Sequence, residues 1–274
     1  MDRTTAQSQA PGVRAVGLTR PLHWLALGWR DLRRCPLPGL VHGAAMAAFG
    51  VLLLALARDR FWLLAGAFSG FLLVAPIVAT GLYAVSRELE HGRRPGLRTA
   101  LAAWRPRDRR LVVFGGLLAL AGTGWVLTSA SLITGFATEP VNNPADFLRV
   151  VVLGGPAHLF EVWLALGGAL AAPVFASSVI AIPLLLDRRS TVMQAVLTSV
   201  RAALLNPAPM ALWATLIMAL TVLGMLATAM VGLVVVVPWL AHASWHAYRD
   251  LVEPSVGPDI EPGVGLPAEP SDRA

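Results

Sequence analysis

The sequence contains no lysine, a single cysteine and little charge of either sign. Only 14% of its 274 residues are charged, whereas a soluble globular domain carries about 25%. A soluble fold is therefore excluded, because too little charge is left to cover its surface. Cys35 alone cannot form an internal disulfide, which excludes an oxidised framework. Apolar residues make up 56% of the chain and its mean hydropathy is +0.64. A disordered chain is therefore also excluded, and we expect a membrane protein.

Long apolar runs match the thickness of a bilayer, which about 20 helical residues cross. The last run, from Met210 to Ala247, is about twice this length. Division near Met230 gives two helices, whereas one long bent helix would leave an odd number of spans. We predict an all-α, polytopic membrane bundle of six transmembrane helices. The approximate spans are residues 37–57, 61–86, 111–136, 162–186, 210–228 and 230–247.

The arginines predict the orientation of these spans. With six spans, 19 of the 22 arginines fall on the side of the two termini, and only Arg58, Arg60 and Arg149 fall on the other. Because positive residues stay in the cytoplasm, both termini are predicted to be cytoplasmic, in a bacterial inner membrane. The membrane domain, residues 21–252, is expected between two disordered tails, residues 1–20 and the proline-rich acidic residues 253–274. The first tail lacks the apolar segment of a cleaved signal peptide.

An internal repeat groups the spans into three hairpins. A short segment with helical apolar spacing precedes each outward span and ends at a proline, as in Leu22, Leu25, Trp29 and Leu32 before Pro36. The third copy has Met193, Val196, Val200 and Leu204 before Pro207. We predict three parallel units, each with a cytoplasmic amphipathic helix, an outward span and a returning span.

The amphipathic helices carry arginine on one face and leucine or tryptophan on the other, which is typical of helices in the headgroup region. They are predicted either to bind anionic lipid or to act as ordinary connectors whose arginines only set topology. The candidate headgroup ligands are Arg30, Arg33, Arg34, Arg94, Arg98, Arg105 and Arg201.

Several segments together resemble one bacterial family. They are Arg30 to Pro38, Gly70 to Pro76, Ile182 to Arg188, Asn206 to Met210 and His242 to Leu251. In these segments the chain resembles a family of predicted integral membrane proteins catalogued as domain of unknown function 2189. The resemblance extends from about Leu22 to Val252 and implies an inner-membrane protein. It implies no activity, substrate or catalytic residue.

Ionisable groups near the spans are few. The core of every predicted span lacks Asp, Glu and Arg, which argues against an ion-driven transporter. His242 and His246 lie four apart on one helix face, and His42 enters the first span at similar depth. These three histidines are candidate haem or metal ligands. A structural role is the alternative, because no carboxylate or thiolate completes a zinc motif.

Hydroxyl residues provide another possible site. In the third and fourth spans they can line a polar path or bond their own helix carbonyls, and we expect the second. These residues are Thr123, Thr128, Ser129, Ser131, Thr134, Ser177 and Ser178. No Walker loop, dinucleotide fingerprint or nucleophile elbow occurs in its required context, so no enzyme and no cofactor is predicted.

The sequence thus leaves three functions open, of which the first is favoured. It is a non-enzymatic accessory or scaffold that contacts anionic lipid or a membrane protein partner. The alternative is a passive or gated carrier of a small amphiphile or lipid, and the third is a haem or metal protein. Nucleic acid is not an expected partner, because the arginines lie beside apolar spans.

Overall fold

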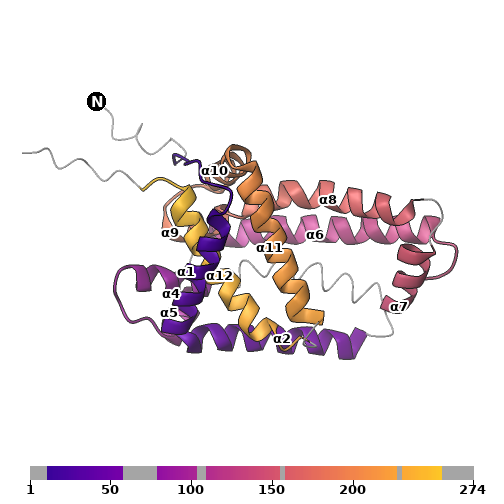
Figure 1. Ribbon diagram of the computed structural model, residues 1–274, viewed down its shortest axis with the longest axis horizontal. Coiled ribbons are helices and arrows are strands. Elements are labelled where there is room, and N and C mark those ends of the chain that lie inside the picture. Colours follow the sequence, from indigo (N-terminus) through magenta and orange to yellow (C-terminus); the bar gives the residue numbers. More distant parts are fainter. Residues whose placement is uncertain (1–10, 58–78, 104–108, 155–157, 227–229, 255–274) are drawn as a thin grey trace, which may run out of the picture.

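The computed structural model describes residues 11–57, 79–103, 109–154, 158–226 and 230–254, and this part of the chain is mainly helical. The helices are α1 (Arg20–Arg34), α2 (Pro36–Ala57), α4 (Thr80–Glu90), α5 (Leu97–Ala103), α6 (Arg109–Phe136), α7 (Pro144–Asp146), the π-helix η1 (Phe147–Leu153), α8 (Leu159–Ser178), α9 (Ala181–Asp187), α10 (Val192–Leu205), α11 (Pro207–Leu226) and α12 (Leu233–Leu251). Helices α2, α6 and α8 extend toward the end where α7 lies, while α1, α4, α5 and α9 gather at the opposite end (Figure 1).

Among the described residues, four helices are long and apolar enough to cross a membrane. They are Pro36–Leu53, Arg109–Phe136, Leu159–Asp187 and Pro207–Met225. These agree with the first, third, fourth and fifth predicted spans, so the described part of the chain is helical with several candidate membrane spans. Most of the second predicted span, residues 61–86, lies outside the described residues. Six spans and their grouping into three hairpins stay predictions.

The long apolar run near the carboxyl end forms two helices, as predicted. Helix α11 ends at Leu226 and α12 begins at Leu233. Between them Met230 has a left-handed φ of 74°, and its N–H donates to the Met225 carbonyl oxygen at 2.9 Å. A backbone bond of this kind across a left-handed residue closes helix ends. The single bent helix is therefore wrong.

Helix α12 packs closely against both α1 and α2. A Cβ on Gly28 of α1 would lie 2.8 Å from the Ala243 Cα, and one on Gly43 of α2 would collide with the Val234 carbonyl oxygen. Only glycine allows backbones to approach so closely, which is common between membrane helices. These two contacts place α12 against the first two helices of the chain.

The two ends of the described chain pair with each other. Val13 and Val252 form an isolated antiparallel β-bridge. The N–H of Arg14 donates to the Leu251 carbonyl oxygen at 2.9 Å, and that of Glu253 to the Gly12 carbonyl oxygen at 3.0 Å. We call this pairing the terminal clasp. The prediction that residues 1–20 form a disordered tail is wrong from residue 12 onward, because backbone hydrogen bonds hold this segment.

The three predicted short helices are present in the described residues as α1, α5 and α10. Some of their predicted apolar residues are buried against the protein and others are exposed. In α1, Leu25 and Leu32 are buried against the protein, while Leu22 and Trp29 are exposed. In α10, Met193 and Leu204 are exposed, and the buried face carries small residues such as Ala195 and Ser199. The short helices thus use one face for the protein and present an apolar, arginine-bearing face outward.

Candidate functional site: a buried polar cluster and an exposed arginine surface

Four polar side chains from α1, α4 and α12 meet inside the protein. Asp31 Oδ2 lies 2.7 Å from His246 Nε2 and accepts a hydrogen bond from Ser86 Oγ at 2.9 Å. Ser86 Oγ also lies 2.7 Å from His242 Nδ1. Asp31 is 2% exposed, and Ser86 and His242 are completely buried. We call Asp31, Ser86, His242 and His246 the buried cluster.

The hydrogen-bond partners in the cluster determine which atom donates in each bond. Ser86 has one hydroxyl proton, which it donates to the Asp31 carboxylate, so His242 Nδ1–H must donate to Ser86 Oγ. Burial alone would raise the pKa of Asp31. Hydrogen bonds from His246 and Ser86, with the nearby charges of His246 and His242, outweigh burial and hold that pKa below its ordinary value. The carboxylate is therefore kept ionised in the protein interior.

The third predicted histidine lies beside this cluster. His42 is buried on α2, and its Nδ1–H donates to the Pro38 carbonyl oxygen at 2.8 Å. Its Nε2 lies 2.9 Å from the position that a Cβ on Gly81 of α4 would occupy. His42 is thus packed against the cluster's helix α4.

The metal prediction gains no support from this arrangement. No three His, Cys, Asp or Glu side chains in the described ranges are placed to hold a metal ion. The structure brings His242 and His246 together around Asp31 and Ser86, which bind them as hydrogen-bond partners. The three candidate ligands His42, His242 and His246 thus each form hydrogen bonds within the protein.

Sequence reasoning missed Asp31 and Ser86. Asp31 stands among Arg30, Arg33 and Arg34, in a helix expected to face water and lipid. A signal was present, because Trp24, Gly28 and Asp31 recur at helical intervals, and all three belong to the buried face of α1. The buried face was not recognised because it combines tryptophan, glycine and a carboxylate rather than leucines alone.

Further polar contacts surround the cluster at the same end of the bundle. Asp250 accepts hydrogen bonds from Arg20 Nε at 2.6 Å and Trp24 Nε1 at 2.9 Å. Burial would raise the pKa of Asp250, but the hydrogen bonds and charge of Arg20, with the Trp24 bond, lower it. Glu90 likewise pairs with Arg249 and accepts from Trp245 Nε1 at 3.1 Å. These contacts attach α12 to α1 and α4.

The predicted headgroup arginines form an exposed surface without compensating charge. All but Arg105, which lies outside the described residues, are exposed. None makes an ion pair or side-chain hydrogen bond with any residue that the structure describes. We call Arg30, Arg33, Arg34, Arg94, Arg98 and Arg201 the arginine surface. Arg109 and Arg189, which sequence reasoning did not single out, are also exposed.

Other arginines at this end are used within the protein. Arg20 pairs with Asp250, Arg93 with Glu88 and Arg249 with Glu90. Arg188 Nε donates to the Tyr248 hydroxyl at 3.1 Å. The contrast separates structural arginines from those of the arginine surface, which remain available to an external anion.

The hydroxyl residues of α6 and α8 mostly bond their own helices, as expected. Thr123, Thr128 and Thr134 donate to carbonyl oxygens four residues earlier, and Ser177 and Ser178 donate to the Val174 carbonyl oxygen. Ser129 accepts from Trp163 Nε1 at 2.7 Å. These hydrogen bonds therefore lie within α6, within α8 or between the two helices.

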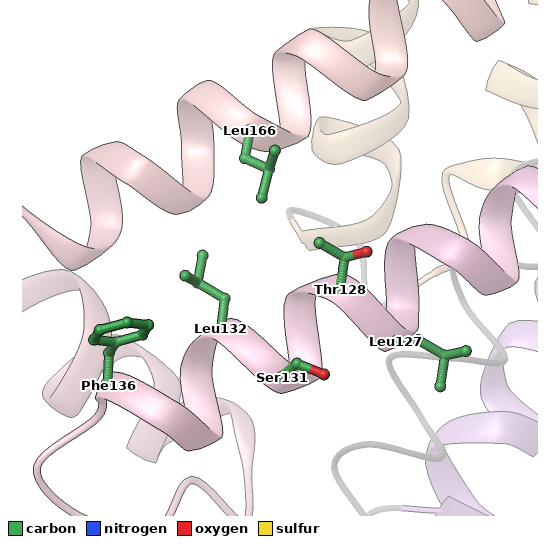
Figure 2. A pocket seen from close by; sticks show the side chains of 6 residues that line it. All are labelled: Leu127, Thr128, Ser131, Leu132, Phe136 and Leu166. Carbon is green, nitrogen blue, oxygen red and sulfur yellow. The ribbon is translucent and has the colours of Figure 1, made fainter.

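A hollow of about 490 Å³ lies between α6 and α8. Figure 2 shows Leu166 of α8 facing a row of α6 side chains. The lining residues are Leu127, Thr128, Ser131, Leu132, Phe136 and Leu166. Hydrocarbon dominates the lining, and the Thr128 hydroxyl is already bonded to the Gly124 carbonyl oxygen. The lining of the hollow is therefore mainly apolar.

Comparison with protein families identifies the central part of the chain. The model of DUF2189, described as a predicted integral membrane protein, matches residues 63–187. The resemblance is confirmed over this stretch. The DUF2189 match is shorter than the expected stretch from Leu22 to Val252. It contains Ser86, Arg94 and Arg98, whereas Asp31 and the cluster histidines lie outside it.

The DUF2189 description agrees with a multi-pass membrane protein of unknown function and names no enzymatic activity. No curated protein and no solved structure matches the chain. The buried cluster and the arginine surface are therefore the features from which a function can be inferred.

Proposed function

We propose that this protein is a non-enzymatic scaffold of the bacterial inner membrane that crosses the bilayer six times and binds anionic lipid through its arginine surface. Both termini then lie in the cytoplasm. The terminal clasp supports an even number of crossings, because Val13 and Val252 are paired at one end of the molecule. The distribution of arginines supports the cytoplasmic side, since positive residues are retained there.

The observation that carries lipid binding is the state of the arginine surface. Six exposed guanidinium groups lack a carboxylate partner among the described residues, although other arginines at the same end have one. Guanidinium binds phosphate through paired, charge-assisted hydrogen bonds. Each arginine near an anionic leaflet contributes about 1 kcal/mol of attraction.

Exposed apolar side chains stand on the same helix faces as these arginines. On α10, Leu197, Arg201 and Leu205 are four residues apart and all exposed. On α5, Arg98 and Leu101 are three residues apart and both exposed. Such a face inserts its apolar side chains below the phosphates while arginine remains among them. It fits a lipid surface better than water.

The test is lipid binding to the purified full-length protein. Native mass spectrometry of the protein titrated with phosphatidylglycerol counts the lipids retained by the wild type and by a variant with all six arginines of the arginine surface changed to glutamine. If each arginine contributes about 1 kcal/mol, the variant binds at least ~10-fold less tightly.

The matched control is Arg149→Gln. Arg149 is exposed but pairs with Glu139 in the region of α7 and η1, at the opposite end of the bundle. This variant retains full lipid binding. Equal retention by wild type and the six-arginine variant, with both folded, would refute the proposal, and a stable co-purified protein with no bound lipid would indicate a protein scaffold.

A further inference from the structure

We propose that the junction of α1, α2 and the loop between α4 and α5 is a specific binding site for a lipid that carries two phosphate groups. This inference rests on the proposed function and names the lipid class that one part of the arginine surface selects. We call the site, formed by Arg33, Arg34 and Arg94 with the first turns of α2, the junction site.

One contact brings the arginines of the junction site together. The Cys35 thiol donates a hydrogen bond to the Pro95 carbonyl oxygen at 3.3 Å. Arg33 and Arg34 immediately precede Cys35, and Arg94 immediately precedes Pro95. Exposed arginines from segments 60 residues apart therefore lie next to this contact along the chain. Figure 1 shows the end of α1 and the start of α2 beside α5.

Every nearby carboxylate in the described residues is already bound. Glu88 pairs with Arg93, and Glu90 pairs with Arg249. Asp31 is buried and binds His246 and Ser86. The positive charge of the junction site is thus left uncompensated within the described part of the chain. Grouping like charges raises the energy of the free protein, and a multivalent anion relieves this repulsion.

The helices that carry the junction site are held in place by close packing. Gly28 fits α1 against Ala243 of α12. A Cβ on Gly81 of α4 would lie 2.8 Å from the Ala100 carbonyl oxygen, so α5 lies directly on α4. Preorganised charges lose less entropy when a ligand binds. Two phosphates joined in one molecule can therefore be bound together by α1 and the loop.

The first turns of α2 give the site its lipid character. Leu37, Leu40 and Val41 follow Cys35 directly, and all three side chains are exposed. They begin a helix that is apolar enough to cross the membrane. An acyl chain attached to a phosphate at Arg34 would lie along these side chains. The site therefore favours a lipid over a soluble diphosphate.

The test compares three probes on the detergent-purified full-length protein by native mass spectrometry. Cardiolipin carries two phosphates, phosphatidylglycerol carries one, and inorganic pyrophosphate carries two without acyl chains. At equal total phosphate, we expect cardiolipin to bind at least ~10-fold more tightly than phosphatidylglycerol, because its second phosphate binds intramolecularly. Pyrophosphate is expected to compete poorly.

Matched variants assign this preference to the junction site. The double variant Arg34→Gln/Arg94→Gln loses about tenfold in cardiolipin affinity, since one of the two phosphates is released. Its phosphatidylglycerol binding changes much less. The control Arg201→Gln removes an arginine from α10, outside the junction site, and keeps the full cardiolipin preference.

The outcomes separate this inference from the proposed function. Equal affinity for the two lipids, or an undiminished cardiolipin preference in the double variant, refutes the junction site even when the six-arginine variant loses lipid. Tight pyrophosphate binding that excludes cardiolipin also refutes it, because the ligand would then be soluble. Unchanged binding of both lipids in the six-arginine variant refutes the proposed function itself.

Discussion

Asp31 of α1 and His246 of α12 face each other with 2.7 Å between the carboxylate Oδ2 and the imidazole Nε2. Their side chains are 3% and 12% exposed. This pair joins one of the first helices of the chain to the last described helix. Ser86 donates a hydrogen bond to Asp31 and is itself hydrogen-bonded to His242. Substitutions in this pair therefore test how much the buried cluster contributes to the stability of the bundle.

Removing the carboxylate is expected to destabilise the bundle strongly. Asp31→Ala leaves His246 and Ser86 without their shared acceptor, and each buried donor left without a partner costs about 1–3 kcal/mol. Thermal unfolding of the detergent-purified protein measures the loss. Arg30→Ala is the control. Arg30 is the neighbour of Asp31 in the chain, but its side chain is exposed and has no ion-pair partner among the described residues. Equal melting temperatures for the two variants would contradict the role of Asp31.

Acidification is expected to weaken the same contact. The pKa of Asp31 is lower in the folded protein than its ordinary value of 3.8. A depressed carboxyl pKa gives stability that is fully present above the unfolded pKa and is lost as pH falls through the folded pKa. The melting temperature of the wild type should therefore fall as pH drops below about 4.

The variant Asp31→Asn isolates this effect. It is less stable at neutral pH, and its melting temperature should depend less on pH in the acid range, because the group that takes up the proton is gone. Asp250 also has a lowered pKa, so part of the acid dependence remains in the variant. An identical acid slope in both proteins would show that Asp31 contributes nothing to it.

The close approach of α2 and α12 predicts an unusual sensitivity to a single methyl group. Gly43→Ala places a Cβ against the Val234 carbonyl oxygen and should cost about 1–3 kcal/mol through overpacking. Gly124→Ala on α6 is the matched control, because its Cβ would meet nothing within 4 Å. Alanine also favours helix over glycine, so the control should be neutral or more stable. Thermal unfolding distinguishes the two.

Reporter fusions test the proposed topology. A reporter inserted at Arg98 and one placed after Pro254 should both be active in the cytoplasm, and one at Glu139 should be active outside it. The reason is that the even number of spans returns the chain to the side on which Val13 and Val252 pair. A reporter at Arg98 that reads outside, or a carboxyl end opposite the amino end, would overturn the six-span arrangement.

The sequence alone predicted the four described helices that are long and apolar enough to cross a membrane. The starts of α2 and α11 follow from Pro36 and Pro207, since proline suits the first turn of a helix and stops the preceding one. Apolar length then gave α6 and the α8–α9 segment within a few residues. These features are local, so they can be read without knowing which helices meet.

The candidate site depended on contacts that local patterns do not contain. The spacing of His242 and His246 predicted a shared helix face, but their partner Asp31 is 215 residues from His246. The exposed arginines were predicted from the positive-inside pattern, but the contact between Cys35 and Pro95, which brings the segments of Arg34 and Arg94 together, has no signal in the sequence. The terminal clasp was missed for the same reason, because Val13 and Val252 have no signal of pairing in sequence.

The terminal clasp also constrains the order of biosynthesis. A ribosome adds about 5–20 residues per second, so many seconds separate the appearance of Val13 from that of Val252. During this interval α1 has been made but α12 has not, and Asp31 has no imidazole to bind. Until α12 is made, neither the Asp31–His246 contact nor the terminal clasp can form. Closure of the clasp is then a late event that reports completion of the whole bundle.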